Sequence, residues 1–284
     1  MNTIVILGAG QFGRTAASLL NTNHLKLLAF GDNNPKLQGT SIQQVPVLSV
    51  EQAVQLKPDY LLTGVIDEVR SGQLRSQAVA AGFQGTWILL GDLYRQLDVR
   101  SATLFRLASR ILQGNVPGDI AELGVYQGDL AWKLNAWFPG RRLYLFDTFE
   151  GFDVRDISIE QDLSCSKAQE GDFSDTSEAF VLKRLPHPET AVIRKGYFPD
   201  TAKGLEENRY AFVSLDADLY APILAGLTYF YPRLSPGGMI LLHDYNNERF
   251  RGARQAVEDF ESKSGSLSLV PLCDLHGSAV IVHP

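Results

Sequence analysis

Acidic side chains follow two apolar runs in the last third of the chain. Asp216 directly follows one run and Asp218 comes two residues later, whereas His243 and Asp244 directly follow the next run. If both runs are adjacent strands of a parallel sheet, their carboxyl ends meet at the edge where ligands bind. Two carboxylates with an imidazole or water could hold a divalent cation there. Oxygen ligands favour magnesium or calcium, and histidine would admit manganese.

The chemistry of such a cluster would be the activation of a hydroxyl group. A metal can bind the hydroxyl oxygen and lower its pKa while a nearby carboxylate takes the proton. The oxygen could then attack an activated methyl group in line. The alternatives are structural: Asp218 could cap the helix that follows, and His243 could be a packed or surface residue.

A glycine turn earlier in the chain favours a nucleoside ligand without phosphate. Glu122 stands just before Gly124, Gly128 follows four residues later, and the next strand ends at Asp147. A carboxylate at that strand end is placed to accept both ribose hydroxyls. An acid at the turn suits the ammonium and sulfonium groups of S-adenosylmethionine (SAM) better than it suits NAD. We expect Glu122 to anchor the loop or to bind the cationic amino-acid part of SAM.

A second glycine turn opens the chain. Gly8, Gly10 and Gly13 follow an apolar strand and open a helix, and Asp32 lies 22 residues after Gly10. This is the dinucleotide fingerprint, in which glycines let a pyrophosphate approach the helix N-terminus. The alternative is that the glycines only allow tight strand–helix packing. Residues 33–95 contain no histidine and no Tyr-x-x-x-Lys pair, so NAD-dependent hydride transfer is the weaker hypothesis.

Both turns need alternating strands and helices to position them. The pattern predicts two doubly wound α/β domains, a Rossmann-like parallel sheet over residues 1–95 and a seven-stranded sheet over 115–284, joined by a helical linker over 96–114. The last two strands, separated by a short turn, favour an antiparallel hairpin at the end of the second sheet. The polar stretch 153–177 is expected to be an irregular loop that covers a site. The expected strands are 3–7, 26–31, 60–65 and 86–90, then 119–124, 142–146, 191–193, 211–215, 239–242, 267–272 and 278–282.

Composition excludes several classes of protein. The 284 residues are 45% hydrophobic and 20% charged, which are globular values. With 26 basic against 32 acidic residues and a net charge of -6, we expect no nucleic-acid partner. Two cysteines cannot form a disulfide framework, and no apolar run is long enough to span a membrane. The absence of a basic leader favours a cytoplasmic protein.

Residues from about 103 to 284 resemble the macrocin O-methyltransferase family, whose relatives methylate sugar hydroxyls of macrolide and aminocoumarin antibiotics. The resemblance rests on strings in one order: 121–128, 146–152, 173–177, 195–201, 215–220, 234–238 and 243–246, leading to 252–260. It implies a SAM-dependent methyltransferase fold with a reversed last strand. It also implies a divalent metal, usually magnesium, held at the ends of the fourth and fifth strands, with the strand-four acid as general base.

Carried over residue by residue, the resemblance implies two sets of site residues. Asp216 is general base and metal ligand, and Asp244 is a ligand. His243 stands where antibiotic-tailoring members carry aspartate, which leaves the third ligand and the metal, magnesium or manganese, open. The cofactor-binding residues are Glu122, Gly124, Tyr126, Gly128, Asp147 (the ribose acid), Thr148, Asp175, Ser177, Gly196 and Tyr197, with the 175–177 and 195–197 segments near adenine.

Residues 1–95 resemble the nucleotide-binding domains that precede sugar acyltransferases and sugar-nucleotide dehydratases, through the segments 31–35 and 45–48. The predicted function is SAM-dependent O-methylation of a hydroxyl on a sugar or glycosylated metabolite. A nucleotide or sugar nucleotide is the expected ligand of the first domain. The alternatives are an NAD(P)-dependent oxidoreductase and a non-catalytic binding protein. The acceptor's identity is open, and the sequence is compatible with a homo-oligomer.

Overall fold

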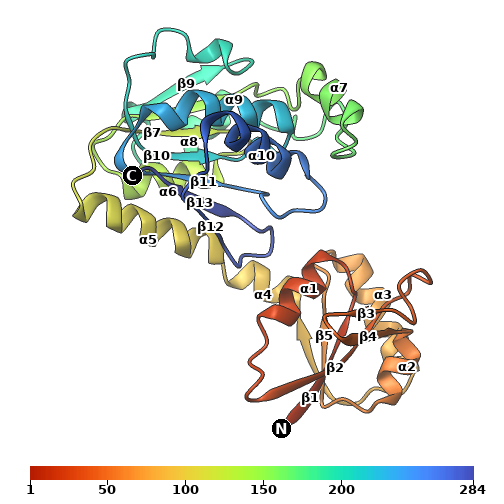
Figure 1. Ribbon diagram of the computed structural model, residues 1–284. Coiled ribbons are helices and arrows are strands. Elements are labelled where there is room, and N and C mark those ends of the chain that lie inside the picture. The colour runs from red at the N-terminus through yellow and green to blue at the C-terminus, as the bar shows by residue number, and fades with distance from the viewer. The chain divides into compact units, whose positions relative to one another are not determined.

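The computed structural model describes all residues, Met1–Pro284, and divides into two compact units, Met1–Asp98 and Val99–Pro284 (Figure 1). The helix α5 (Val99–Gln113) opens the second unit and buries Leu104, Ala108 and Ile111 in that unit's core. Most of the segment 96–114, expected to be a linker, is therefore a packed part of the second unit.

The first unit is a six-stranded sheet in the order β3-β4-β2-β1-β5-β6, with helices on its faces. All pairs are parallel except the short β3–β4 hairpin. Its elements are β1 (Asn2–Leu7), α1 (Gln11–Ser18), β2 (Leu25–Gly31), β3 (Ser41–Ile42), β4 (Val45–Leu48), α2 (Val50–Gln55), β5 (Tyr60–Thr63), α3 (Glu68–Ala80), β6 (Thr86–Leu89) and α4 (Leu90–Gln96).

Two features of the first unit differ from the prediction. The hairpin β3–β4 was not expected, because strands of two and four residues show no period, and Pro46 interrupts the second one. Gln43 and Gln44 form its turn with φ of 50° and 68°. The helical linker expected over 96–114 begins at the last residue of α4 and continues as α5, and the two helices are separate because Leu97 has extended backbone (φ -127°, ψ 100°).

The second unit (Figure 1) holds a seven-stranded sheet and nine helical segments, three of them short 3-10 helices. After α5 its elements are β7 (Asp119–Leu123), α6 (Asp129–Trp137), β8 (Leu143–Asp147), α7 (Val154–Asp162), α8 (Glu178–Arg184), η1 (Pro188–Thr190), β9 (Ala191–Lys195), η2 (Asp200–Ala202), β10 (Tyr210–Leu215), α9 (Tyr220–Phe230), η3 (Tyr231–Arg233), β11 (Leu234–Leu242), α10 (Gly252–Ser264), β12 (Leu269–Pro271) and β13 (Ala279–Val282). Helix α7 lies within the stretch 153–177, which is therefore less irregular than expected.

The strand order of this sheet is β12-β13-β11-β10-β7-β8-β9. Five strands are parallel, while β13 pairs antiparallel with β11 on one side and with β12 on the other. The predicted two-domain α/β fold with an antiparallel last strand is confirmed. Because the order reverses between β7 and β10, the carboxyl ends of these neighbouring strands form the crevice in which doubly wound sheets bind ligands.

Two hydrophobic cores fix the faces of this sheet. Helices α9 and α10 cover one face through Ile223, Leu227, Ala256 and Phe260, and α5, α6 and α8 cover the other. Strand residues alternate between the cores: Val213 faces the first and Phe212 the second. Burial on both faces explains why these strands read as continuous apolar runs.

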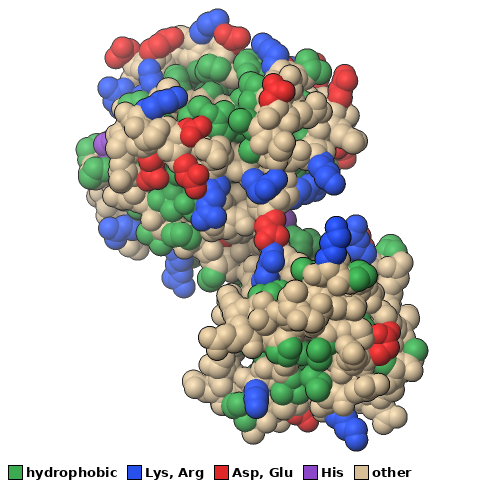
Figure 2. Space-filling view, turned by 45° about the vertical axis from the view of Figure 1, so that its right-hand side comes forward, with side chains coloured by type: hydrophobic (Ala, Val, Ile, Leu, Met, Phe, Trp, Pro, Cys, Tyr) green, Lys and Arg blue, Asp and Glu red, His purple; other side chains and the backbone are tan.

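The surface is mixed in charge. On the face shown in Figure 2, basic and acidic side chains are interspersed over each unit. No helix of the protein is long and apolar enough to cross a membrane.

Candidate functional site

The acids that follow β10 and β11 meet at one point. Leu215 pairs with Leu242 across these strands, so the residues after them leave the sheet side by side. One ligand atom each from Asp216, Asp218, His243 and Asp244 lies within 4.8 Å of the others. The structure thus brings together the three predicted metal-site residues and places Asp218, for which capping was the alternative, in the same cluster.

Charged partners set the protonation of this cluster. The Nδ1 atom of His243 lies 2.8 Å from Oδ1 of Asp216 and 3.2 Å from Oδ2 of Asp244. Although burial opposes it, the negative charge of Asp216 raises the pKa of His243 to about 9. Against its own burial, Asp216 has a pKa held well below its ordinary range by Arg100 and His243. Without another cation, the site therefore balances ionised Asp216 against two cationic side chains.

Arg100 was not anticipated by the sequence analysis. Its Nη2 atom donates to Oδ2 of Asp216 at 2.7 Å, and its side chain is only one-fifth exposed. It comes from the second residue of α5, more than one hundred residues before Asp216. No local motif surrounds Arg100, so only the packing of α5 on the sheet reveals it.

Asp218 does not cap the following helix, so that alternative is wrong. The N-cap position of α9 is Leu219, which makes no side-chain capping bond. Asp218 has left-handed backbone with φ 57°, and so has Asp244 with φ 58°. Burial and a hydrogen bond with Asp244 raise the pKa of Asp218 well above its ordinary value. The two carboxyl groups therefore face each other and need a proton or a cation between them.

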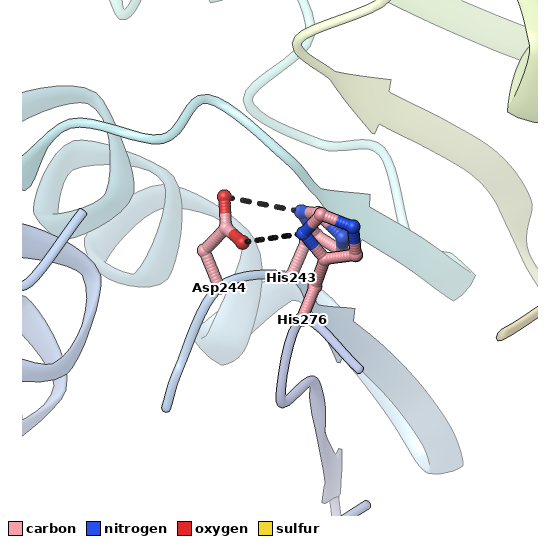
Figure 3. Close-up of side chains that lie close together, drawn as sticks. All are labelled: His243, Asp244 and His276. Atoms are coloured by element: carbon pink, nitrogen blue, oxygen red, sulfur yellow. Dashed lines mark ion pairs between the residues drawn. The ribbon is translucent and has the colours of Figure 1, made fainter. Parts of the chain in front are cut away.

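His243 is neither remote from the acids nor on the surface, since its side chain is 13% exposed and faces two carboxylates. A second imidazole, His276, approaches the cluster from the loop between β12 and β13 (Figure 3). Its Nδ1 atom lies 3.9 Å from Oδ1 of Asp244. On the other side, the amide of Asn247 donates to the same Oδ1 at 2.6 Å. His276 and Asn247 were both missed, because an isolated histidine or asparagine carries no spacing signal.

The donor set fits a divalent cation. Carboxylate oxygens and imidazole nitrogens converge within 4.8 Å of one another, and the hydrogen bond between Asp218 and Asp244 requires a proton on one of the two carboxyl groups. A cation would let both carboxylates ionise. Asp216, Asp218, His243 and Asp244 are the residues that could hold it.

The glycine turn after β7 lies directly against this cluster. Gly124 has φ 86°, and a Cβ atom there would come within 2.1 Å of the backbone oxygen of Asp216. Only glycine lets the turn approach that closely. Gly128 also has left-handed backbone, φ 77°, where α6 begins. The predicted cofactor turn and the predicted metal acids therefore share one edge of the sheet.

Asp147 holds this turn in place. Its Oδ2 atom accepts the backbone N–H of Val125 at 2.7 Å and that of Tyr126 at 2.9 Å, and its Oδ1 atom accepts that of Phe149 at 2.6 Å. A carboxylate has about four acceptor positions. Three are filled by backbone N–H groups, the hydroxyl of Thr148 makes a longer contact with Oδ1 at 3.5 Å, and the ribose role of Asp147 stays a prediction.

Glu122 lies beneath the turn and is 1% exposed. Its Oε2 atom is buried without a hydrogen-bond partner. Burial and the nearby charge of Asp216 raise its pKa well above the ordinary value. A cationic ligand group would supply the missing partner, which fits the amino-acid part of SAM.

Several other predicted cofactor residues line the turn. The hydroxyl of Tyr126 donates to Oδ1 of Asp175 at 2.8 Å. Ser177 caps α8 by accepting the N–H of Phe180 at 3.2 Å. The hydroxyl of Thr148 donates to the backbone oxygen of Gly151 at 2.6 Å. These hydrogen bonds hold the loops that carry the four residues close to the turn.

Tyr197 is engaged by α7. Its hydroxyl donates to Oδ1 of Asp156 at 3.0 Å, and the guanidinium of Arg155 lies 3.6 Å from the ring centroid. One ring face is therefore covered by the guanidinium group, and the adenine contact of Tyr197 stays a prediction. Gly196, with φ 128°, makes the turn that presents Tyr197.

In the first unit, the predicted nucleotide turn has the expected shape. A Cβ atom at Gly13 would come within 1.9 Å of the Gly8 oxygen, whereas one at Gly10 would meet nothing within 4 Å. Asp32 uses Oδ2 to accept the N–H of Ala9 at 2.7 Å and Oδ1 to accept that of Asn34 at 2.8 Å. The packing role of the glycines is thus visible, and the nucleotide ligand stays a prediction.

A cavity of about 440 Å³ lies beside the acid cluster. Its walls come from the end of α7, the loop after β11 and the first turns of α10, and Asn247 belongs both to this wall and to the cluster. The lining residues are Leu163, Ser164, Cys165, Tyr245, Asn246, Asn247, Glu248, Arg251, Arg254, Gln255 and Glu258. This volume lies within the usual range of small-molecule sites, about 300–1,000 Å³.

The family model described as macrocin O-methyltransferase (TylF) matches residues 98–280. The chain belongs to the macrocin O-methyltransferase family. The match begins at the boundary between the units and covers nearly all of the second one. It confirms the resemblance drawn from the motifs, and it makes the protein a SAM-dependent O-methyltransferase. Methyl transfer is thereby favoured over the oxidoreductase and non-catalytic alternatives.

Two curated relatives share this region. The 4'-O-methyltransferase of 8-demethyl-8-(2,3-dimethoxy-alpha-L-rhamnosyl)-tetracenomycin C from Streptomyces olivaceus is 28% identical over 180 residues, 60% of this chain and 67% of the relative. The mycinamicin III 3''-O-methyltransferase from Micromonospora griseorubida is 30% identical over 166 residues, 54% of this chain and 64% of the relative. The matches thus span about two thirds of the relatives' length.

Solved structures support the fold. The O-methyltransferase NovP superimposes with a TM-score of 0.54 and 20% identity over 65% of this chain and 79% of its own. The calicheamicin methyltransferase CalS11 gives a TM-score of 0.53 and 23% identity over 68% of this chain and 83% of its own. At these identities the similarity is one of architecture.

Proposed function

We propose that this protein transfers the methyl group of SAM to a hydroxyl of a sugar or glycosylated metabolite, with the help of a divalent cation. The observation that carries the proposal is the meeting of Asp216, Asp218, His243 and Asp244 directly against the glycine turn at Gly124. The curated relatives, whose names describe methylation of a rhamnosyl group and of mycinamicin III, support the choice of acceptor.

The acceptor would bind in the cavity beside the cluster. Tyr245 offers an aromatic face, Asn246 and Asn247 offer amides, and Arg251 and Arg254 offer guanidinium groups. Rings of this kind pack against the C–H faces of saccharides, and the amides and guanidinium groups bond their hydroxyls. Because Asn247 also contacts Asp244, a sugar in this cavity would have hydroxyls next to the acids.

Methyl transfer requires the acceptor oxygen to form a bond to the methyl carbon as the carbon–sulfur bond breaks and its electrons remain on sulfur. The hydroxyl proton must pass to a base. Asp216, the base implied by the resemblance, is poorly suited, since Arg100 and His243 contact its two oxygens and its pKa is strongly lowered. Asp218 is the better candidate: a cation at the cluster would let it ionise, and its buried carboxylate would then readily take up the proton of the hydroxyl.

The cation would stabilise the developing negative charge on the acceptor oxygen. The carboxylates of Asp244 and Asp216 would supply negative charge opposite the cation. The turn at Gly124 would hold the cofactor next to these acids. Glu122 would pair with the ammonium group of SAM. The first unit, with its fingerprint turn at Gly8–Gly13, would bind a nucleotide or sugar nucleotide.

The test is transfer of a labelled methyl group from SAM to a panel of glycosides and nucleotide-linked sugars. We expect methylated glycoside that requires both a divalent cation and Asp218. Asp218→Asn should lower kcat by at least about 100-fold, the usual contribution of a general base, and leave SAM affinity within about two-fold. Asp216→Asn would lower kcat and SAM affinity together if the acid acts through the turn. Full activity of Asp218→Asn, or of metal-free enzyme, would contradict the proposal.

A further inference from the structure

Two imidazoles face one carboxylate at the metal edge of this site. His243 and His276 lie with ring centroids 5.2 Å apart and ring planes 31° from parallel. Figure 3 shows both rings on the same side of Asp244, with one carboxylate oxygen directed at each. The three residues place one ligand atom each within 4.8 Å of the others.

The loop that carries His276 is fixed by its own contacts. Asp274 is buried and accepts the backbone N–H of Ser278 at 2.8 Å and its hydroxyl at 2.9 Å. Gly277 has φ 73°, and a Cβ atom there would come within 2.6 Å of Asn246. The backbone N–H of Asn246 donates to the Gly277 oxygen at 2.8 Å. These contacts fix the turn that carries His276, so its imidazole is held next to Asp244.

Ordinary hydrogen bonding does not account for the contacts of His243. Its Nδ1 atom is buried and lies close to oxygens of Asp216 and Asp244, yet it has no hydrogen-bond partner. A single N–H at Nδ1 cannot serve two carboxylates fully, whereas one cation can bind an imidazole nitrogen and carboxylate oxygens together.

The balance of donors disfavours magnesium. Magnesium prefers an octahedron of oxygens and several waters, whereas imidazole nitrogen suits first-row transition metals. Arg100 already neutralises Asp216 and occupies its Oδ2 atom, which lowers the carboxylate charge available to a hard cation. At bond lengths of about 2.1 Å, ligand atoms around one metal stand about 3 to 4.2 Å apart. The observed spacing needs only small adjustments to reach this.

We propose that the site binds a first-row transition-metal dication, represented by Mn²⁺, through His243, His276 and Asp244, in preference to Mg²⁺. Metal binding by these residues does not depend on the proposed function. Only the metal's part in methyl transfer rests on it. The residues themselves set the preference, since two of three donors are nitrogen. His276 is then a metal ligand contributed by the loop between β12 and β13.

The test uses the whole chain stripped with a chelator and titrated with MnCl2. Loss of the free Mn²⁺ electron paramagnetic resonance signal gives the stoichiometry and Kd, and pulsed measurements on bound Mn²⁺ detect imidazole ¹⁴N. We expect one Mn²⁺ per chain with nitrogen coupling, displaced only by more than about 100-fold excess MgCl2. His276→Gln should weaken Mn²⁺ binding by about 10- to 100-fold and reduce the nitrogen modulation.

Two further variants keep the test decisive. His276→Asp restores a ligand that is oxygen, so it should recover binding and shift the preference toward Mg²⁺. His187→Gln, an exposed histidine paired with Glu189 on the surface, should change neither affinity nor spectrum. Thermal unfolding without metal shows whether each variant is folded. If His276→Gln does not fold, the test uses the spectrum of Mn²⁺ bound to His276→Asp. Weaker nitrogen modulation than in the parent supports the inference, and unchanged modulation contradicts it.

Absence of nitrogen coupling in the parent protein, or equal displacement of Mn²⁺ by equimolar Mg²⁺, would overturn the inference. These readouts need neither SAM nor acceptor. If Mn²⁺ binds through nitrogen while the stripped enzyme still methylates, the metal site stands and the catalytic role of the metal fails. If methyl transfer needs a metal that shows no nitrogen coupling, only the present inference fails.

Discussion

The carboxyl group of Asp156 makes a sharp test of how α7 is packed. It is 6% exposed and accepts a hydrogen bond from the Tyr197 hydroxyl at 3.0 Å. Burial raises its pKa from 3.8 to about 6, although the Tyr197 hydrogen bond opposes the change. Replacing Asp156 with asparagine removes the titration and keeps an oxygen that can accept the same hydrogen bond.

The direction and size of the change in unfolding free energy depend on the pKa of Asp156 in the folded and unfolded states. The folded state binds the Asp156 proton more tightly than the unfolded state does, so this group stabilises the fold at low pH. That contribution is lost as the pH rises from about 4 to about 6, and the loss is complete above the folded pKa. At 1.36 kcal/mol per pKa unit, it amounts to about 3 kcal/mol. Asp156→Asn should therefore be more stable than the parent by about 2–3 kcal/mol at pH 7.5 and by less than about 1 kcal/mol at pH 4.

Urea unfolding at both pH values measures this difference. A Trp87→Phe background leaves Trp132 and Trp137 as reporters in the second unit, which avoids mixing the transitions of two units. Asp162→Asn, an exposed acid at the end of the same helix, is the matched control and should show no difference that grows with pH. An Asp156→Asn effect that is constant from pH 4 to 7.5, or destabilising at pH 7.5, would refute the reasoning.

Three further substitutions test the edge of the sheet. Arg100→Lys keeps the charge but loses the planar fork, so unfolding free energy from urea titration should fall by about 1–2 kcal/mol; an unchanged value would mean that the Asp216 contact is unimportant. Gly124→Ala should cost about 2–4 kcal/mol and weaken SAM binding at least ten-fold by calorimetry. Gly140→Ala, also at positive φ but with nothing within 4 Å, should cost only the backbone strain and spare SAM binding. Asp147→Asn should loosen the turn and weaken SAM binding at least ten-fold in the same assay, whereas Asp32→Asn should leave it unchanged; equal effects would remove Asp147 from the cofactor site.

The sequence was sufficient for the architecture and for the acids. Long apolar runs buried on both sides, such as the one ending at Leu215, are visible as strands because nearly every residue is hydrophobic. Turns after strands also carry strong signals, since Gly124 is required by close backbone approach. Asp216 and Asp244 could be placed at one edge because parallel strands end together, which needs only the strand assignment.

What the sequence missed depends on tertiary contacts. Arg100 and His276 lie outside every motif and reach the site from a preceding helix and from a late loop. The role of Asp218 was undecided, because an acid before a helix is usually a cap, and its left-handed backbone is a property of the folded strand end. The engagement of Asp147 by backbone N–H groups also follows from loop geometry that spacing does not encode.

The left-handed backbone of Asp218 and Asp244 has a consequence for engineering. Conformations of this kind cost on the order of 1 kcal/mol or more for a non-glycine residue, and glycine adopts them without strain. Selection for heat resistance or expression yield alone would therefore reward Asp218→Gly, which relieves both the backbone strain at this residue and its repulsion by Asp244. A library improved in that way would lose its methyl-transfer machinery while each variant looked better folded than the parent. Any stabilisation campaign on this chain should hold these two positions constant and select for turnover together with yield.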